Sequence, residues 1–167
     1  MNNIEKIDFK SKNELYEYLN MSLTGLIQQE PDWLANLCNA SALLWQLLDD
    51  INWAGFYLYK NNELVLGPFQ GKMACTHIEI GHGVCGTAAK ELKTQLIKNV
   101  HEFPGHIACD SASNSEIVVP IIKNDRLIGV LDIDSPLLGR FNEVDKVNLE
   151  EFVSIIVKYI QFPETFI

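Results

Sequence analysis

The sequence predicts an α+β fold in which a central, mostly antiparallel sheet carries the N- and C-terminal helices on one face. Three observations lead to this prediction: helical periodicity before residue 50, short strands joined by turns between 51 and 134, and a return of helical periodicity after Asn142. The 167 residues are 47% hydrophobic and 21% charged, which is typical of a folded globular domain. We therefore expect one domain with one core.

Two helices are predicted at the N-terminal end. Ser11 to Glu14 has the form of a capping box and opens a helix over 12–29, and Pro31 and Asp32 start a second helix over 31–48. Cys38 falls in the apolar stripe of the second helix, so we expect it to be a small core residue. The residues that define the two helices are Leu15, Tyr16, Leu19, Leu23, Leu26 and Ile27, then Leu34, Leu37, Cys38, Ser41, Leu44, Trp45 and Leu48.

The period of the apolar residues changes at Ile51, and from there to Tyr59 both faces of the chain are apolar or aromatic. This pattern predicts a central strand that is buried on two sides. Further along, Gly81-His82-Gly83 breaks the strand pattern and precedes a short helix over 84–92. The other predicted strands are 63–69, 74–80, 94–99, 116–122 and 126–134, and the last helix opens at Asn142.

Composition argues against several kinds of partner. The formal net charge of -9 disfavours nucleic acid and anionic membranes, because a phosphate backbone requires a basic surface. No apolar run approaches the roughly 20 residues that span a bilayer, and the N-terminus does not resemble a secretory signal. We therefore expect a cytoplasmic protein, in which clustered cysteines are more often catalytic, redox-active or metal-binding than structural disulfides.

Three of the four cysteines lie in one segment, at Cys75, Cys85 and Cys109, and all four histidines lie among them or close by. Such crowding fits either a metal site or a thiol redox site. Structural zinc sites use closely spaced ligand pairs, and these cysteines are too far apart to form one. The spacing therefore favours thiol chemistry over a metal site. The histidines are His77, His82, His101 and His106.

The residues around each cysteine favour Cys85 as the nucleophile. Cys85 lies in the first turn of a predicted helix beside His82, where free backbone N–H groups and the helix dipole are expected to lower its pKa. Cys109 lies in a predicted loop over 101–114, directly before Asp110, whose charge is expected to raise the pKa of the thiol. The alternative for any one of these cysteines is an inert buried thiol.

Acidic residues predict a binding pocket. The strand period places Asp132 and Asp134 on one face with Ile128 and Val130, where two charges are costly unless they have a function. The alternative is that both carboxylates reach solvent at the strand end. If the start of the neighbouring strand converges on them, the pocket suits a small ligand with an amine and an apolar part. Its expected lining is Glu116, Asp132 and Asp134, with the aromatic wall Trp53 and Tyr57.

The motifs of this chain closely resemble those of the free methionine-(R)-sulfoxide reductases, a family of single GAF domains. The resemblance extends from about residue 11 to 160 and implies a single GAF domain over 1–167 with its core at about 31–160. The motifs that carry it are Trp53-Ala-Gly-Phe-Tyr57, Gly83-Val-Cys85-Gly-Thr-Ala88, Ala108-Cys109-Asp110, Ser115-Glu116-Ile-Val-Val-Pro120 and Gly129-Val-Leu-Asp132-Ile-Asp134-Ser.

The resemblance implies reduction of free methionine-(R)-sulfoxide to methionine without a metal or organic cofactor. It implies that Cys109 is the catalytic cysteine, that Cys75 resolves it, and that Cys85 is a third thiol able to pair with Cys109. Thioredoxin then reduces the disulfide. Trp53, Tyr57 and the three carboxylates are the implied substrate-binding residues.

The resemblance and the local physics disagree about the nucleophile. We favour Cys109, because the pocket carboxylates follow it and a loop cysteine is able to swing between substrate and partner thiol. Two other classes stay open: a GAF-type sensor of a small molecule or redox state, and a metal-binding protein. A homodimer packed through the terminal helices is compatible with the sequence.

Overall fold

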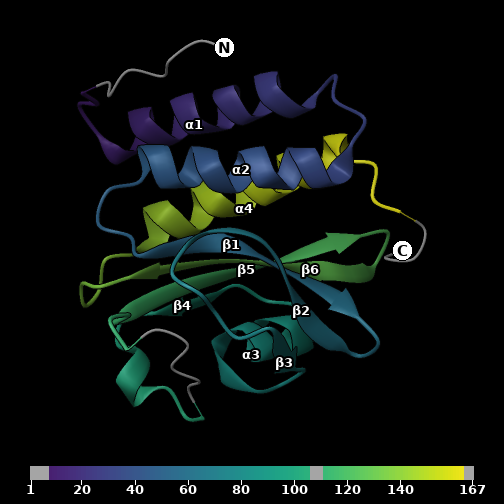
Figure 1. The fold of residues 1–167 in the computed structure, drawn as a ribbon. Coiled ribbons are helices and arrows are strands. Elements are labelled where there is room, and N and C mark those ends of the chain that lie inside the picture. The colour runs from purple at the N-terminus through teal and green to yellow at the C-terminus, as the bar shows by residue number, and fades with distance from the viewer. Residues whose placement is uncertain (1–7, 106–110, 164–167) are drawn as a thin grey trace.

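The computed structural model describes residues 8–105 and 111–163, which form a six-stranded antiparallel sheet between two helical layers (Figure 1). The sheet order is β3-β2-β1-β6-β5-β4. The α+β prediction is confirmed. The elements are α1 (Lys12–Ile27), α2 (Trp33–Leu47), β1 (Trp53–Lys60), β2 (Glu63–Gly71), β3 (His77–Glu79), α3 (Gly83–Glu91), β4 (Gln95–Ile97), the 3-10 turn η1 (Val100–Glu102), β5 (Ser115–Lys123), β6 (Arg126–Ser135) and α4 (Glu143–Tyr159).

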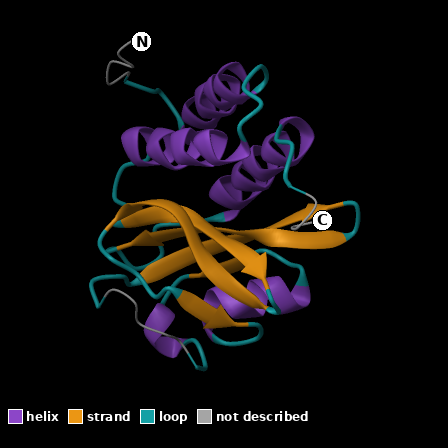
Figure 2. Cartoon of the chain, turned by 45° about the vertical axis from the view of Figure 1, so that its right-hand side comes forward, coloured by secondary structure: helices purple, strands orange, loops and turns teal. Residues whose placement is uncertain are grey.

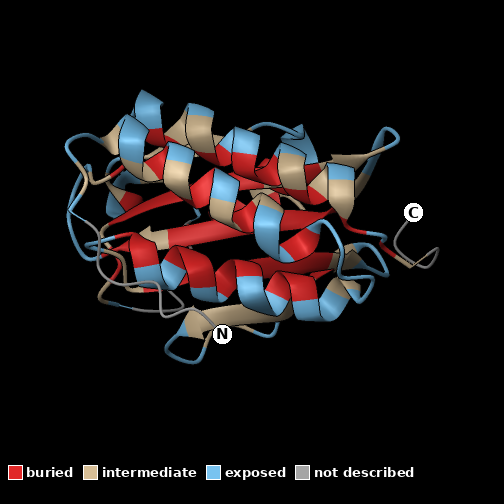
Figure 3. Ribbon diagram, turned by 90° about the horizontal axis from the view of Figure 1, so that it is seen from above, coloured by how far each residue is buried: buried red, intermediate tan, exposed pale blue. Residues whose placement is uncertain are grey.

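The terminal helices cover one face of the sheet, as expected (Figure 2). α2 and α4 pack on the strands, and α1 packs on α2 and α4 as an outer layer. The inner sides of these helices are buried and their outer sides exposed (Figure 3), so each helix is amphipathic. Tyr16, Leu44 and Phe152 join Phe56 and Leu131 of the sheet in the main core.

A buried carboxylate ties α1 to α4. Asp145 completes a capping box with the N-cap Asn142 and accepts hydrogen bonds from Tyr16 Oη at 2.9 Å and Lys12 Nζ at 2.5 Å. Arg140 Nη1 donates to the same carboxylate at 3.1 Å. Since Asp145 is fully buried, these donors supply the hydrogen bonds that its charge requires.

The expectation that Cys38 is a core residue is wrong. Cys38 is exposed, as are Leu34 and Trp45, which share its side of α2. The buried side of α2 instead carries Leu37 and Leu44, among others. Apolar residues occur on both sides of this helix, so the sequence pattern alone did not identify the side that meets the sheet.

The sheet register brings the predicted pocket residues into line. Trp53 pairs with Asp134, which pairs in turn with Glu116, so the three residues form one row across β1, β6 and β5. In the next row Gly55 pairs with Asp132. Because alternate residues of a strand point to opposite faces, this row pattern gathers the carboxylates on the face opposite α1, α2 and α4.

The prediction that Ile128 shares a strand face with Asp132 and Asp134 is wrong. Ile128 is buried in the main core beneath the helices, whereas Val130 lies on the pocket face as expected. The pairing of β5 with β6 shifts register between Ile121 and Ile122, where Ile121 pairs with Gly129 and Ile122 with Leu127. This irregularity leaves Ile128 without a partner in the ladder and turns it to the other face.

The second face of the sheet is covered by α3 and β3 (Figure 1). A smaller core lies there, in which Val84 and Ala88 of α3 meet Val118 and Val130 of the sheet. Across residues 8–105 and 111–163, the helices are all too short or too polar to cross a membrane.

Candidate functional site

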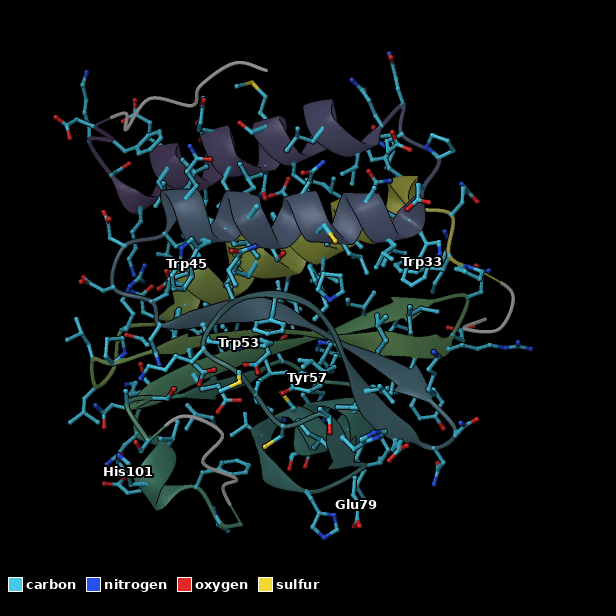
Figure 4. The ribbon with its side chains drawn as sticks, viewed as in Figure 1. Trp33, Trp45, Trp53, Tyr57, Glu79 and His101 are labelled. Atoms are coloured by element: carbon cyan, nitrogen blue, oxygen red, sulfur yellow. The ribbon has the colours of Figure 1, made fainter. Side chains whose placement is uncertain are left out.

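A pocket lies between the second face of the sheet and α3, at the end of β1 where Trp53 begins the strand. Figure 4 shows Trp53 and Tyr57 extending from β1 toward the α3 side. Elements far apart in the sequence line the pocket, which therefore exists only in the folded chain. Its lining residues are Trp53, Tyr57, Met73, Ala74, Ile78, His82, Gly83, Val84, Cys85, Ser113, Glu116, Asp132 and Asp134.

One wall of the pocket is a stack of aromatic rings. The Trp53 ring lies between Tyr57, at 5.7 Å between centroids, and Phe69, at 5.2 Å. Trp53 Nε1 donates to the carbonyl of Lys72 at 3.2 Å, and Tyr57 Oη donates to the carbonyl of Cys75 at 3.0 Å. These bonds fix both rings, so the wall is formed before any ligand binds.

The opposite side of the pocket is acidic. Glu116 and Asp132 are each only 6% exposed, and Asp134 is half-buried. Within the described part of the chain, Asp132 Oδ1 is buried and has no hydrogen-bond partner. A buried carboxylate oxygen without a donor is costly, so this atom is available to a cationic or hydrogen-bonding ligand.

Burial and mutual repulsion change the titration of these carboxylates. Burial raises the pKa of Asp132 to about 7, although hydrogen bonds with Cys85 and Glu116 act against the rise. Burial, followed by the charges of Asp132 and Asp134, holds the pKa of Glu116 well above its usual range. The two carboxyls are therefore a coupled pair, in which ionisation of one favours protonation of the other.

The expected lowering of the Cys85 pKa is wrong. Cys85 does lie in the first turn of α3, but its side chain is buried and its thiol faces Glu116 Oε1 at 3.9 Å. Burial, and then the charges of Asp132 and Glu116, raise the pKa of Cys85 well above its usual value. Desolvation and like charge outweigh the helix N-terminus, so Cys85 is a neutral thiol.

The other predicted cysteines differ in what the structure describes. Cys75 is half-buried beside the pocket-side core and is disulfide-bonded, whereas Cys85 and Cys38 are free. Cys109 lies outside the described residues. The pocket and Cys75 are connected directly, because the Cys75 carbonyl accepts the hydrogen bond of Tyr57.

The histidines of the described chain make surface contacts. His77 contacts Glu63 at 3.0 Å, and His82, which lines the pocket mouth, contacts Glu79 at 3.2 Å. His101 lies within η1, with its Nε2 at 2.8 Å from Asn114 Oδ1. His106 lies outside the described residues.

Some pocket residues were not predicted from the sequence. Ser113 is buried at the end of its loop and accepts a hydrogen bond from Asn52 Nδ2 at 3.0 Å. Met73 borders the pocket while 91% exposed, and Ile78 and Val84 supply apolar contacts. For Ile78, the alternation of β3 was a usable signal; for Met73 and Ser113, only the fold reveals their proximity.

Comparison with known proteins identifies the family. A family model of the GAF domain matches residues 40–161. The free methionine-R-sulfoxide reductase of Escherichia coli (strain K12) is 52% identical over 90% of this chain and 91% of its own length. The chain belongs to the free methionine-R-sulfoxide reductase family. The resemblance read from the motifs is thereby confirmed.

Two further free methionine-R-sulfoxide reductases extend the comparison. The protein of that name from Saccharomyces cerevisiae is 49% identical over 91% of this chain and 89% of its own length. The X-ray structure of free methionine-R-sulfoxide reductase from Neisseria meningitidis in complex with its substrate is 42% identical and covers 92% of each chain, with a TM-score of 0.88. Similarity in both sequence and structure therefore extends over nearly the whole chain.

Proposed function

We propose that this protein reduces free methionine-(R)-sulfoxide to methionine. The observation that carries the proposal is the pocket in which a fixed aromatic wall faces buried carboxylates. Trp53 and Tyr57 contact the methylsulfinyl end of the substrate, and Asp132, with Asp134, binds its ammonium group. A residue within a peptide has no free ammonium group, so this pocket selects the free amino acid.

The reaction transfers one oxygen atom and two electrons. A cysteine thiolate attacks the sulfoxide sulfur, the sulfur–oxygen bond breaks, and the products are methionine and a cysteine sulfenic acid, with one proton taken up. A second thiol then attacks the sulfenic sulfur and releases water, which leaves a disulfide. Thioredoxin dithiol reduces that disulfide by exchange and becomes oxidised itself.

Glu116 is the proton donor in this proposal. Burial, followed by the charges of Asp132 and Asp134, raises its pKa and favours its protonated form, and it lines the cavity with Asp132. A protonated carboxyl donates a hydrogen bond to the sulfoxide oxygen and passes its proton as the sulfur–oxygen bond breaks. Asp132, with a pKa near 7, binds the ammonium group when it is ionised.

Cys109 is the proposed nucleophile and Cys75 the resolving cysteine. The raised pKa of the buried Cys85 counts against Cys85 as the attacking thiolate and leaves it as the alternative resolving thiol. The disulfide-bonded state of Cys75 supports a role in the redox cycle. We further propose that residues 1–167 form one GAF domain with its core at about 31–160, and that the protein acts in the cytoplasm.

A homodimer packed through the terminal helices is also part of this proposal. Leu34 and Trp45 are 45% and 42% exposed on the same side of α2, with Cys38 between them. Burial of such a stripe against a second copy removes apolar surface from water. Sedimentation of the wild type and a Trp45→Glu variant tests this, and a wild type that sediments as a monomer contradicts it.

A coupled assay tests the activity. Thioredoxin, thioredoxin reductase and NADPH are supplied with either epimer of free methionine sulfoxide, and a methionine-sulfoxide peptide serves as the control substrate. We expect NADPH consumption with the free R epimer only. Equal turnover of the peptide contradicts the pocket that selects the ammonium group.

A single-turnover experiment tests the nucleophile. Pre-reduced protein is mixed with substrate without thioredoxin, and the methionine formed is measured. We expect Cys109→Ser to form none, Cys75→Ser to form up to one equivalent, and Cys85→Ser to behave like Cys75→Ser. A Cys109→Ser variant that retains a full equivalent overturns the assignment.

A further inference from the structure

Three buried side chains of the pocket are arranged as ligands for a metal ion. The thiol of Cys85 and one carboxylate oxygen each from Glu116 and Asp132 lie within 4.8 Å of one another. All three side chains are at least nine-tenths buried, and they come from α3, β5 and β6. Asp132 also has a buried oxygen, Oδ1, without a hydrogen-bond partner in the described chain.

One of the three ligand separations is close to that required by a small tetrahedral ion. Zinc bonds of about 2.3 Å to sulfur and about 2.0 Å to oxygen place the two ligand atoms roughly 3.5 Å apart in a tetrahedral site. The observed separation of Cys85 Sγ and Glu116 Oε1 is 3.9 Å, so only a small movement is required. The three ligands come from regular elements, which limits further movement.

The donor set selects the kind of ion. Magnesium and calcium prefer six or more oxygen ligands, whereas a thiolate with carboxylates suits zinc. A thiolate and two carboxylates carry three negative charges, and a divalent cation relieves the repulsion among them. The cavity provides access for a water molecule as the fourth ligand.

We propose that Zn²⁺ binds to Cys85, Glu116 and Asp132, and that it excludes the substrate ammonium group from the same carboxylates. The zinc site rests on the geometry alone, and its competition with substrate rests on the proposed function. Zinc then binds in either redox state and inhibits the reduced enzyme, because Cys85 is a free thiol even when Cys75 is disulfide-bonded.

Protons are released when the ion binds. Cys85 loses its thiol proton to form the zinc–sulfur bond, and the proton held by the two carboxyls also leaves. Binding that releases one proton strengthens about tenfold for each unit of rising pH, and binding that releases two strengthens more steeply.

Calorimetric titration of the disulfide form with ZnCl₂ tests the site, since Cys85 and Cys38 are free thiols in the part of the chain that the structure describes. We expect one zinc per chain, with an affinity that rises at least about tenfold between roughly pH 6 and pH 7. Cys85→Ser and Asp132→Asn, both close in size to the native residues, should each weaken binding by at least about tenfold. Cys38→Ser is the matched control and should bind as the wild type does.

Cadmium gives a second readout that does not depend on affinity. A cadmium–thiolate bond absorbs in the ultraviolet, so Cd²⁺ should produce this band in the wild type and in Cys38→Ser but not in Cys85→Ser. The proposal is overturned if zinc does not bind, if binding survives both pocket substitutions, or if the cadmium band requires Cys38. Circular dichroism of each variant checks that it is folded.

Competition with L-methionine separates the zinc site from the proposed function. Methionine carries the same ammonium group as the substrate, so saturating methionine should weaken zinc binding to the disulfide form. An unchanged zinc affinity contradicts the proposal that zinc and the substrate ammonium group compete for the same carboxylates. If zinc binds through Cys85 and Asp132 but the reduced protein consumes no sulfoxide, the proposed function fails and the zinc site stands. If the reduced protein consumes sulfoxide but binds no zinc, the zinc site fails and the proposed function stands.

Discussion

Asp132→Asn should gain stability relative to the wild type as pH rises, while it removes activity. The carboxylate lies in a buried pocket with an oxygen that no described group satisfies, and burial raises its pKa from 3.8 to about 7. A group whose pKa is raised by folding contributes stability below its unfolded pKa and loses that contribution as pH rises through the folded pKa. The wild type is therefore penalised at pH 7 and above, and the neutral amide of the variant is not.

The size of the expected change in stability follows from the shift in the pKa of Asp132. The rise from 3.8 to about 7 corresponds to a penalty of up to about 4 kcal/mol at alkaline pH. Glu116 shares its proton with Asp132, so part of this value belongs to the pair, and we expect between about 1 and 4 kcal/mol. An unpaired amide N–H in the variant costs a similar amount at every pH, so the decisive quantity is the change with pH.

Urea unfolding at several pH values between about 4 and 8 measures this change. The free energy of unfolding of Asp132→Asn minus that of wild type should increase with pH through that window. Asp125→Asn, at an exposed turn, is the matched control and should show a constant difference. Parallel curves for Asp132→Asn and wild type would refute the buried, repelled carboxylate on which the pocket chemistry depends.

Three other substitutions, and Gly25→Ala as a control, test the scaffold and the aromatic wall. Asp145→Asn should lower the free energy of unfolding by roughly 3 kcal/mol near pH 7, and this deficit should shrink as pH falls through 3.8 and below. Burial opposes ionisation of Asp145, but the hydrogen bonds from Lys12, Asn142 and Tyr16 outweigh burial and lower the pKa of this carboxyl. Urea unfolding at several pH values measures this deficit, and a deficit that grows as pH falls contradicts the lowered pKa of Asp145. Gly55→Ala should cost about 1–3 kcal/mol, because its new methyl group overlaps Phe69, while Gly25→Ala, with open space around it, should be neutral or stabilising in thermal melts. Trp53→Leu should raise KM for free methionine sulfoxide about tenfold or more through lost contact area, and an unchanged KM would exclude Trp53 from the substrate wall.

The fold was predictable because its patterns are local. The change from helical to strand periodicity at Ile51 and the turns between later strands are readable over a few residues, and the observed elements agree with them within a few positions. The side of α2 that meets the sheet was not readable, since Leu34, Cys38 and Trp45 form an apolar stripe as plausible as the buried one. Packing against α1 and the sheet decides between them.

The site was predictable only in part, for a related reason. The strand period identified Asp132 and Asp134, and the register confirms that Glu116 and Trp53 share a row with Asp134. The titration of Cys85 was predicted with the wrong sign, because the sequence shows its helix N-terminus but not the carboxylates that β5 and β6 bring to it. Long-range pairing, which single-sequence patterns do not specify, therefore controls the electrostatics of this pocket.

Binding an ammonium group and forming a thiolate have opposite electrostatic requirements in this acidic pocket. Carboxylates that attract a substrate ammonium group also raise the pKa of any thiol beside them, as Cys85 shows. A thiol held permanently in this pocket is therefore a poor nucleophile at neutral pH, and a cysteine that attacks a substrate bound here must form its thiolate away from Glu116 and Asp132. Cys85, which is held beside both carboxylates, does not meet this condition. The division between a fixed neutral thiol in α3 and a proposed nucleophile at Cys109 thus follows from the charge that the pocket requires for binding.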